Sequence, residues 1–162
     1  DRICEITLAI CQHGEVLDEF SSLINPGRPI SPGASAVNGI TDDMVRNSPR
    51  LVEVKASVLS FLGREVPWVA HNLSFDTRML GYDIPKAEWP HCIPTLCTLE
   101  FSRRAFPRQR KHRLIDVATV LGLSPGELHR SRADLLLLSQ IVPRLMGDTT
   151  VAATMSRFSE DW

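Results

Sequence analysis

A hairpin at the start of the chain, followed by alternating strands and helices, narrows the possible folds more than any other feature. Residues 3–11 are β-prone and apolar on both alternating faces, which predicts an interior strand. Residues 13–15 can turn the chain, and residues 16–24 follow as a second, half-buried strand. A short continuous apolar run at residues 66–70 predicts a further strand. Together with helical patterns between and after the strands, this order predicts an α/β fold.

The helical patterns have recognisable starts and stops. Ser48 and Pro49 predict the start of a helix, and Gly63 closes its apolar stripe. Residues 25–32 contain three prolines and predict a rigid loop. Pro143 is expected to bend the last helix or end it early. The remaining patterns predict a short helix from residues 41–43, a helix reaching about residue 80, a strand at 93–96, and helices at 114–121 and 131–146.

Length and composition point to one globular domain. We expect it to cover residues 1–146, with residues 147–162 as a tail without a strong pattern. No apolar run approaches membrane-spanning length, and no signal peptide is visible, which predicts a cytoplasmic protein unless residues are missing upstream. The four cysteines form no Cys-x-x-Cys pair, so buried free thiols are expected rather than structural zinc.

Charge is unevenly distributed along the chain. Residues 1–100 carry eight basic and 13 acidic side chains, whereas residues 101–162 carry ten basic and six acidic ones. Such a basic excess can attract phosphate, but a solvated, arginine-rich loop explains it equally well. Most of the excess lies in Arg103, Arg104, Arg108, Arg110, Lys111 and Arg113, with His112 among them.

His129 and Asp134 flank the start of the last predicted helix, where Ser131 is a suitable N-cap. Five helical residues rotate by about 140° net, so the two side chains could not share a face if both were helical. With His129 in the preceding loop and Asp134 in the first turns, both can converge on one cleft. A movable base beside a fixed carboxylate suits metal-assisted hydrolysis. An exposed loop histidine and a helix-start aspartate favoured by the macrodipole remain the alternative.

Asp76 falls just past the strand at residues 66–70, on the first turn of the following helix. Ligands of open α/β sheets bind beyond the carboxyl ends of the strands. Viewed alone, Asp76 is explained as a helix-start carboxylate. Two acids and a histidine at separate element ends favour a shared site.

Four segments together resemble the DnaQ-like family of 3′–5′ exonucleases, whose four acidic residues and one histidine are abbreviated DEDDh. The hairpin at residues 1–26 resembles the strands after that family's first motif, and residues 36–45 resemble its Gly-Ile-Thr loop. Residues 70–76 (Ala-His-Asn-Leu-Ser-Phe-Asp) resemble its second motif, and His129-x-x-x-x-Asp134 resembles its third. The resemblance covers residues 1–146 in the right order.

The resemblance implies a ribonuclease H-like mixed sheet flanked by helices, and removal of nucleotides from the 3′ end of single-stranded DNA or RNA with two Mg²⁺ or Mn²⁺ ions. It implies that Asp134 ligates metal directly and Asp76 directly or through water. His129 would take the proton from the attacking water. Association with a DNA polymerase subunit stays open.

The resemblance also assigns residues to substrate binding. Asn38 and Ile40 match the family's substrate-facing loop, although many members carry histidine where Asn38 stands. Asn72 and Phe75 would help to shape the pocket for the terminal nucleotide. For Phe75, plain core packing is an equally open explanation.

The family's first motif, an Asp-x-Glu pair, should lie just before Asp1, and nothing here replaces it. Asp1 and Glu5 are spaced by four, and Glu5 is better explained as a strand residue with a local hydrogen-bonding role. Loss of the pair should weaken metal binding steeply. The segment normally forms the central strand, so its loss should leave the edges of two strands unpaired.

We therefore expect an incomplete sequence with further residues upstream. If the 162 residues are complete, negligible nuclease activity is expected. The alternative function is a catalytically degenerate member of the family that binds nucleic acid or a partner. A small α/β protein without a nucleic-acid role would require the matches at Asp76, His129 and Asp134 to be coincidental.

Overall fold

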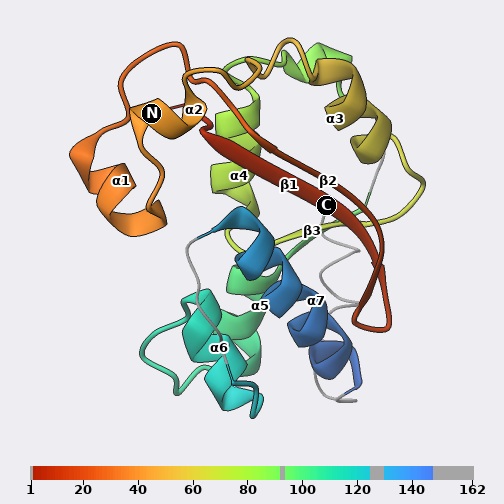
Figure 1. Cartoon of the computed structure of the whole chain (residues 1–162). Helices are drawn as coiled ribbons and strands as arrows, with labels where there is room; N and C mark the ends of the chain where they lie inside the picture. The colour runs from red at the N-terminus through yellow and green to blue at the C-terminus, as the bar shows by residue number, and fades with distance from the viewer. Residues whose placement is uncertain (1, 92–93, 125–129, 148–162) are drawn as a thin grey trace.

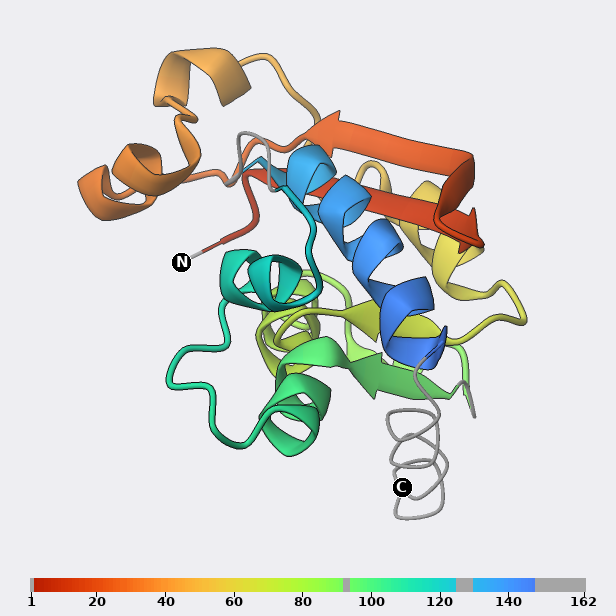
Figure 2. The same ribbon diagram turned by 90° about the horizontal axis from the view of Figure 1, so that it is seen from below.

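The computed structural model describes residues 2–91, 94–124 and 130–147 as a mixed α/β structure. Figures 1 and 2 show α7 crossing one face of the β1–β2 hairpin, with α3 on the other face. The elements are β1 (Glu5–Gln12), β2 (Glu15–Leu23), α1 (Pro32–Asn38), α2 (Asp42–Val45), α3 (Lys55–Leu62), β3 (Trp68–Ala70), α4 (Leu73–Leu80), the 3₁₀ helix η1 (Lys86–Glu88), β4 (Thr95–Cys97), α5 (Thr98–Ala105), α6 (Leu114–Val120) and α7 (Ser131–Gly147).

The hairpin predicted at the start of the chain is confirmed. β1 and β2 pair antiparallel from Glu5 opposite Leu23 to Gln12 opposite Glu15. The two residues between them, His13 and Gly14, both have positive φ angles (52° and 88°). Positive φ at both central positions is the signature of a tight turn whose twist matches that of the flanking strands.

The sheet is in two pieces. Within the described residues, β1 pairs with no strand other than β2, and β3 pairs with no strand other than β4. β3 and β4 run parallel, with Trp68 opposite Thr95. The expectation of two unpaired strand edges is therefore confirmed.

α7 connects the two pieces through a buried apolar face. One side of this helix packs on β1 and β2. Its other side joins a core with Leu96 of β4, Phe101 of α5 and Val117 of α6. A second core lies on the opposite face of the hairpin, against α3 and α4. The residues that α7 contributes to the first core are Leu137, Ile141 and Leu145.

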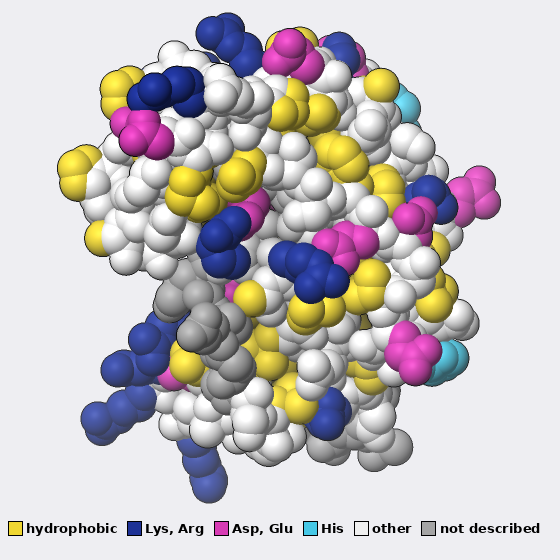
Figure 3. All heavy atoms as spheres, in the orientation of Figure 1, with side chains coloured by type: hydrophobic (Ala, Val, Ile, Leu, Met, Phe, Trp, Pro, Cys, Tyr) yellow, Lys and Arg dark blue, Asp and Glu magenta, His cyan; other side chains and the backbone are white. Residues whose placement is uncertain are grey.

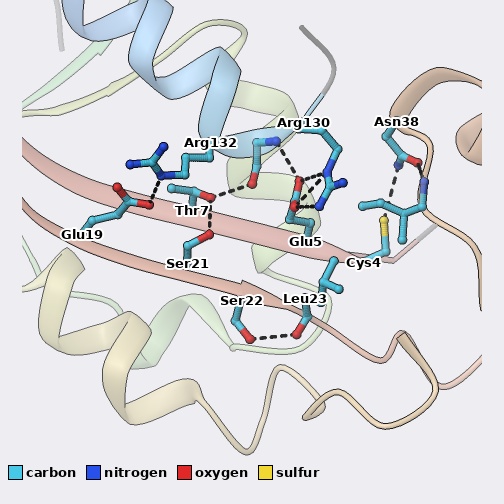
Figure 4. Close-up of polar contacts among 12 residues, drawn as sticks. Cys4, Glu5, Thr7, Glu19, Ser21, Ser22, Leu23, Asn38, Arg130 and Arg132 are labelled. Carbon is cyan, nitrogen blue, oxygen red and sulfur yellow. Dashed lines mark hydrogen bonds and ion pairs between the residues drawn. The ribbon is translucent and has the colours of Figure 1, made fainter. Parts of the chain in front are cut away.

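Polar contacts fasten the first turn of α7 to β1 (Figure 4). The Glu5 carboxylate accepts hydrogen bonds from the Arg130 guanidinium at 2.6 and 3.0 Å and from the Ser131 backbone N–H at 2.8 Å. The Thr7 and Ser131 hydroxyls share a hydrogen bond of 2.6 Å. Because side chains alternate along a strand, Glu5 and Thr7 face α7 while Ile6 packs into the core on the other side.

The other end of α7 rests on the hairpin turn. Pro143 has no N–H to donate to the Ser139 carbonyl. The oxygen of this carbonyl packs against Gly14, where a Cβ would lie 3.6 Å from it. The Ser139 hydroxyl in turn donates to the Gly14 carbonyl at 3.3 Å. α7 continues past Pro143 to Gly147, so of the two expected outcomes, a bend or an early end, the early end was wrong.

Other differences from the predicted elements have local causes. α1 was not predicted, although the Ser31 hydroxyl caps it by accepting from the Ala34 N–H. α5 was not predicted either, because it follows β4 without a connecting loop. The helix predicted from Ser48 begins at Lys55 instead, after a turn region. Cys11 is exposed rather than buried.

None of the helices in the described parts of the chain combines the length and apolar character that a bilayer crossing requires.

The contact between Glu5 and α7 makes stability depend on pH. Burial alone would raise the pKa of Glu5, but hydrogen bonds from Arg130 and Ser131 outweigh it and hold the pKa below its ordinary value of 4.5. This carboxylate therefore contributes stability above pH 4.5, which is lost as the pH falls through its lower folded pKa. We expect Glu5→Gln to lower the free energy of unfolding by about 1–2 kcal/mol at pH 7, and the deficit to shrink in acid.

Urea unfolding at pH 7 and in acid measures this difference. Glu19→Gln is the matched control, because Glu19 accepts one hydrogen bond from the exposed Arg132 at 2.8 Å and should cost below about 1 kcal/mol. A loss at Glu5 that is no larger than that at Glu19, or that persists unchanged in acid, would show that the carboxylate does not hold α7.

Candidate active site

Asp134 lies on the first turn of α7, as the sequence predicted. Its backbone N–H donates to the Arg130 carbonyl at 3.0 Å, which places it one helical turn after the residue held by Glu5. The attachment of α7 to β1 therefore also fixes where the Asp134 carboxylate lies. His129 falls outside the described residues.

Asp76 is brought to the surface by a sharp turn between β3 and α4. Asn72 adopts a left-handed conformation (φ 76°, ψ 52°), and its carbonyl accepts a hydrogen bond from the Phe75 N–H at 2.8 Å. The Asn72 side-chain oxygen also accepts from the Ser74 hydroxyl at 3.2 Å. This turn ends β3 and starts α4 within two residues, so Asp76 stands on the first helical turn.

The Asp76 carboxyl has an altered acidity. Desolvation by the surrounding protein raises its pKa to about 6, with only a partial offset from a backbone hydrogen bond. The residue as a whole is nevertheless exposed. A carboxylate that is accessible yet poorly solvated is stabilised by a nearby cation, which is the arrangement a metal ligand requires.

His71 links the β3–α4 turn to α5 and to the connection before α6. Its Nε2–H donates to the His112 carbonyl at 2.8 Å, and its Nδ1 lies 3.0 Å from the Thr98 hydroxyl. Burial lowers the pKa of His71, while the hydrogen bond to His112 and the negative charge of Asp134 oppose this shift. Asp134 therefore lies close enough to act electrostatically on a residue that stands five positions before Asp76.

Asn38 and Ile40 are engaged inside the protein. The Asn38 amide donates to the Cys4 sulfur at 3.5 Å, and its oxygen accepts from the Ile40 N–H at 2.9 Å (Figure 4). Ile40 is only 1 % exposed, so its side chain does not reach the surface. Of Ile40, only the backbone is therefore available for the predicted contact with substrate.

Phe75 does not pack into the core. Its side chain is one of the exposed large apolar groups, at 47 % exposure, and the Arg78 guanidinium lies 5.6 Å from its ring centre. The alternative explanation of Phe75 as a core residue was wrong.

The carboxylates present are of the right kind for a hard divalent cation but too few to hold one alone. Asp76 and Asp134 supply oxygen ligands, which Mg²⁺ and Mn²⁺ prefer. Among the described residues, however, no group of three or more His, Cys, Asp or Glu side chains could hold a metal ion. Glu5 is engaged by Arg130 and Ser131, which confirms its local hydrogen-bonding role.

Residues that organise the site were missed at the sequence level. His71 and Thr98 each follow directly after a strand, and Thr98 is fully buried. A polar residue at the carboxyl end of a strand was a usable signal, since this is where α/β sheets place functional groups.

Comparison with known proteins agrees with this geometry. The sequence model of the RNase_T family, described as "Exonuclease", matches residues 1–142. DNA polymerase III PolC-type of Thermotoga petrophila is 34 % identical over 149 residues, covering 90 % of this chain and 11 % of the relative. The same protein of Bacillus subtilis is 29 % identical over 154 residues, covering 91 % of this chain and 10 % of the relative. The chain thus spans about a tenth of the length of these relatives.

Solved structures share the fold. Exonuclease X in complex with 5′ overhanging duplex DNA has a TM-score of 0.72 and 28 % identity, covering 91 % of this chain and 84 % of that one. The nuclease domain of 3′hExo, a DEDDh member bound to rAMP, has a TM-score of 0.74 at 16 % identity, covering 91 % and 82 %.

The predicted ribonuclease H-like fold and the predicted enzyme class are thereby confirmed at the level of the family, which uses divalent metal ions. The family match over residues 1–142, together with the shared fold, shows that the chain belongs to the DnaQ-like family of 3′–5′ exonucleases.

Proposed function

We propose that this protein removes nucleotides from the 3′ end of single-stranded DNA or RNA by metal-dependent hydrolysis of the terminal phosphodiester. Residues 1–146 form the exonuclease domain in this proposal. The observation that carries it is that Asp134, on the first turn of α7, lies near enough to His71 for its negative charge to oppose the lowering of the His71 pKa, and His71 begins the turn that bears Asp76. Family membership supports the reaction class.

Asp76 and Asp134 hold divalent metal in this proposal. Two Mg²⁺ or Mn²⁺ ions at such a site would supply Lewis acidity toward the attacking water and the leaving oxygen. The poorly solvated Asp76 supports its assignment, because its anionic form gains from a neighbouring cation. Asp134 is positioned by the hydrogen bonds that fix the start of α7.

His129 accepts the proton of the attacking water. An imidazole with an ordinary pKa near 6.5 is suited to this task at neutral pH. The assignment of His129 is supported by its neighbour in the chain. Arg130, the next residue, donates two hydrogen bonds of 3.0 Å or less to Glu5 and is therefore held in place.

The terminal nucleotide is received beside the β3–α4 turn. The exposed Phe75 ring offers an apolar face for stacking a base, and Arg78 above it adds positive charge. Asn72 contributes an exposed amide at the same turn. Asn38, the last residue of α1, and the backbone of Ile40 line the approach on the side of α1.

A proofreading role beside a DNA polymerase is the proposed context. It is supported by the identity of about a third to the PolC-type DNA polymerase of Thermotoga petrophila. We place this activity in the cytoplasm.

A binding protein of the same fold without catalysis is the second candidate, favoured by the lack of a three-ligand metal group within the described part of the chain.

Replacing either acid should abolish most of the activity. We expect Asp76→Asn and Asp134→Asn each to lower the rate of 3′-end hydrolysis about a hundredfold or more, because each removes an anionic metal ligand while keeping side-chain shape. The assay follows shortening of a 5′-labelled oligonucleotide by the protein as it occurs in the cell, with Mn²⁺ or Mg²⁺.

Asp18→Asn is the matched control for the two acids. Asp18 lies on β2, and its carboxylate forms an exposed ion pair with Arg64. The rate of hydrolysis by this variant should therefore stay near that of the wild type. Activity that survives in both test variants would refute the metal-ligand assignment. Absence of activity in the wild type as well, with oligonucleotide binding retained, would favour the binding-only candidate.

Removal of the proposed general base should lower kcat. His129→Ala is expected to reduce kcat by about 10²–10⁴-fold, the usual contribution of a positioned base, with little change in KM. His91→Ala serves as the control, since His91 is an exposed histidine before β4. Unchanged kcat in His129→Ala would remove this residue from the mechanism.

Phe75 should act on binding more than on chemistry. Loss of one base-stacking ring is expected to raise KM about tenfold in Phe75→Ala while kcat changes little. Tyr82→Ala is a close match, because Tyr82 is also exposed and carries the Arg2 guanidinium 5.2 Å from its ring centre. Equal effects of the two substitutions on KM would mean that Phe75 does not contact the nucleotide.

A further inference from the structure

Positive charge gathers on the connection between α5 and α6. We call residues 103–113, which comprise the last turn of α5 and the connection to α6, the basic loop; all six of its Lys and Arg side chains are exposed. Figure 3 shows Lys and Arg side chains gathered at the lower left, where Figure 1 places this connection. Arg113 is neutralised by Asp116, to which it donates at 2.9 and 3.0 Å. In the described part of the chain, Arg108, Arg110 and Lys111 form no ion pair.

The basic loop is held in shape from within. The His112 ring donates through Nε2 to the Gln109 carbonyl at 3.0 Å, and its Nδ1 lies 3.1 Å from the hydroxyl of the fully buried Ser102. The Gln109 N–H donates to the Phe106 carbonyl at 2.9 Å. Because the backbone of the loop is fixed, its cationic side chains project from a defined surface.

The same loop is tied to the candidate active site. The His112 carbonyl accepts the hydrogen bond of His71 at 2.8 Å, and His71 directly precedes Asn72. Arg103 at the start of the loop is close enough to act electrostatically on His71, as Asp134 does from α7. The loop therefore borders the turn that carries Asp76.

An apolar hollow lies at the base of the loop. Its volume is about 380 Å³, and Val120 on its wall is 43 % exposed. An apolar floor beside cationic side chains suits a single nucleic-acid strand, whose sugars and bases have apolar faces and whose phosphates are anionic. The lining residues are Ala105, Phe106, Pro107, Arg108, Gln109 and Val120.

We propose that the basic loop binds the phosphates of the strand that leads to the 3′-terminal nucleotide, with the hollow receiving the apolar face of one nucleotide. This inference rests on the proposed function, because it assigns the path of the same substrate. The ligand is a single-stranded polynucleotide bound through its backbone, and phosphate contacts carry no base information. The loop should therefore strengthen binding of long strands and leave the terminal nucleotide's own contacts unchanged.

The test compares two double variants of equal charge. Arg108→Ala/Arg110→Ala removes two cations from the loop. Arg28→Ala/Arg50→Ala removes two exposed arginines from the connections after β2 and α2, at the opposite end of the molecule in Figure 1. Fluorescence anisotropy with a labelled oligonucleotide of about 12 residues, in EDTA so that nothing is hydrolysed, gives the affinity across a salt series.

The loop variant is expected to bind the long strand roughly tenfold more weakly. Its plot of log affinity against log salt should be shallower by about 1.4, because about 0.7 is lost for each phosphate contact to a single strand. The control variant should match the wild type in both measurements. Cleavage of a substrate of about three nucleotides should be the same in all three proteins.

The outcomes distinguish strand binding by the basic loop from the proposed hydrolysis of 3′ ends. Unchanged affinity in the loop variant overturns the inference, even if the protein hydrolyses 3′ ends as proposed. Equal losses in the two variants also overturn it, because they would reflect net charge alone. Loop-dependent binding in a protein that never hydrolyses DNA or RNA would support the inference and defeat the proposed function. Circular dichroism confirms that each variant is folded.

Discussion

The hydrogen bonds between Glu5 and the start of α7 are the constraint on which the rest of the structure depends. They bury a carboxylate against the N-terminal end of a helix, where its charge is balanced by Arg130 and by a backbone N–H. α7 contacts the hairpin and contributes to the core that contains Leu96 of β4, so fixing its first turn positions this core against the hairpin. It also fixes Asp134, one turn further along the helix.

His71 forms a second junction, which holds the β3–α4 turn against α5 and the connection before α6. Its half-buried imidazole bridges the Thr98 hydroxyl and the His112 carbonyl. The carboxylates of the candidate site thus stand on two helix starts that are each anchored by a different polar contact. Such anchoring on regular elements holds catalytic groups more firmly than loops do.

Much of the architecture was accessible from the sequence because the signals are local. The hairpin turn at His13 and Gly14, the apolar run that becomes β3 and the first-turn position of Asp134 all follow from short-range patterns. The contacts between Glu5 and Arg130 and between His71 and His112 join residues 125 and 41 positions apart, and no local pattern encodes them. α5 was missed because it follows β4 without a connecting loop, and α1 because it begins at the end of the proline-containing stretch predicted as a loop. His129 lies outside the described residues, so its position remains a prediction.

The contribution of α7 to the core around Phe101 has a consequence for synthesis of the chain. Residues 131–147 come last among the described elements, and translation proceeds from the other end. Until that helix leaves the ribosome, Leu96, Phe101 and Val117 lack the side chains of α7 that cover them. This core can therefore close only after residues 131–147 have been synthesised, and its apolar side chains are open to aggregation until then.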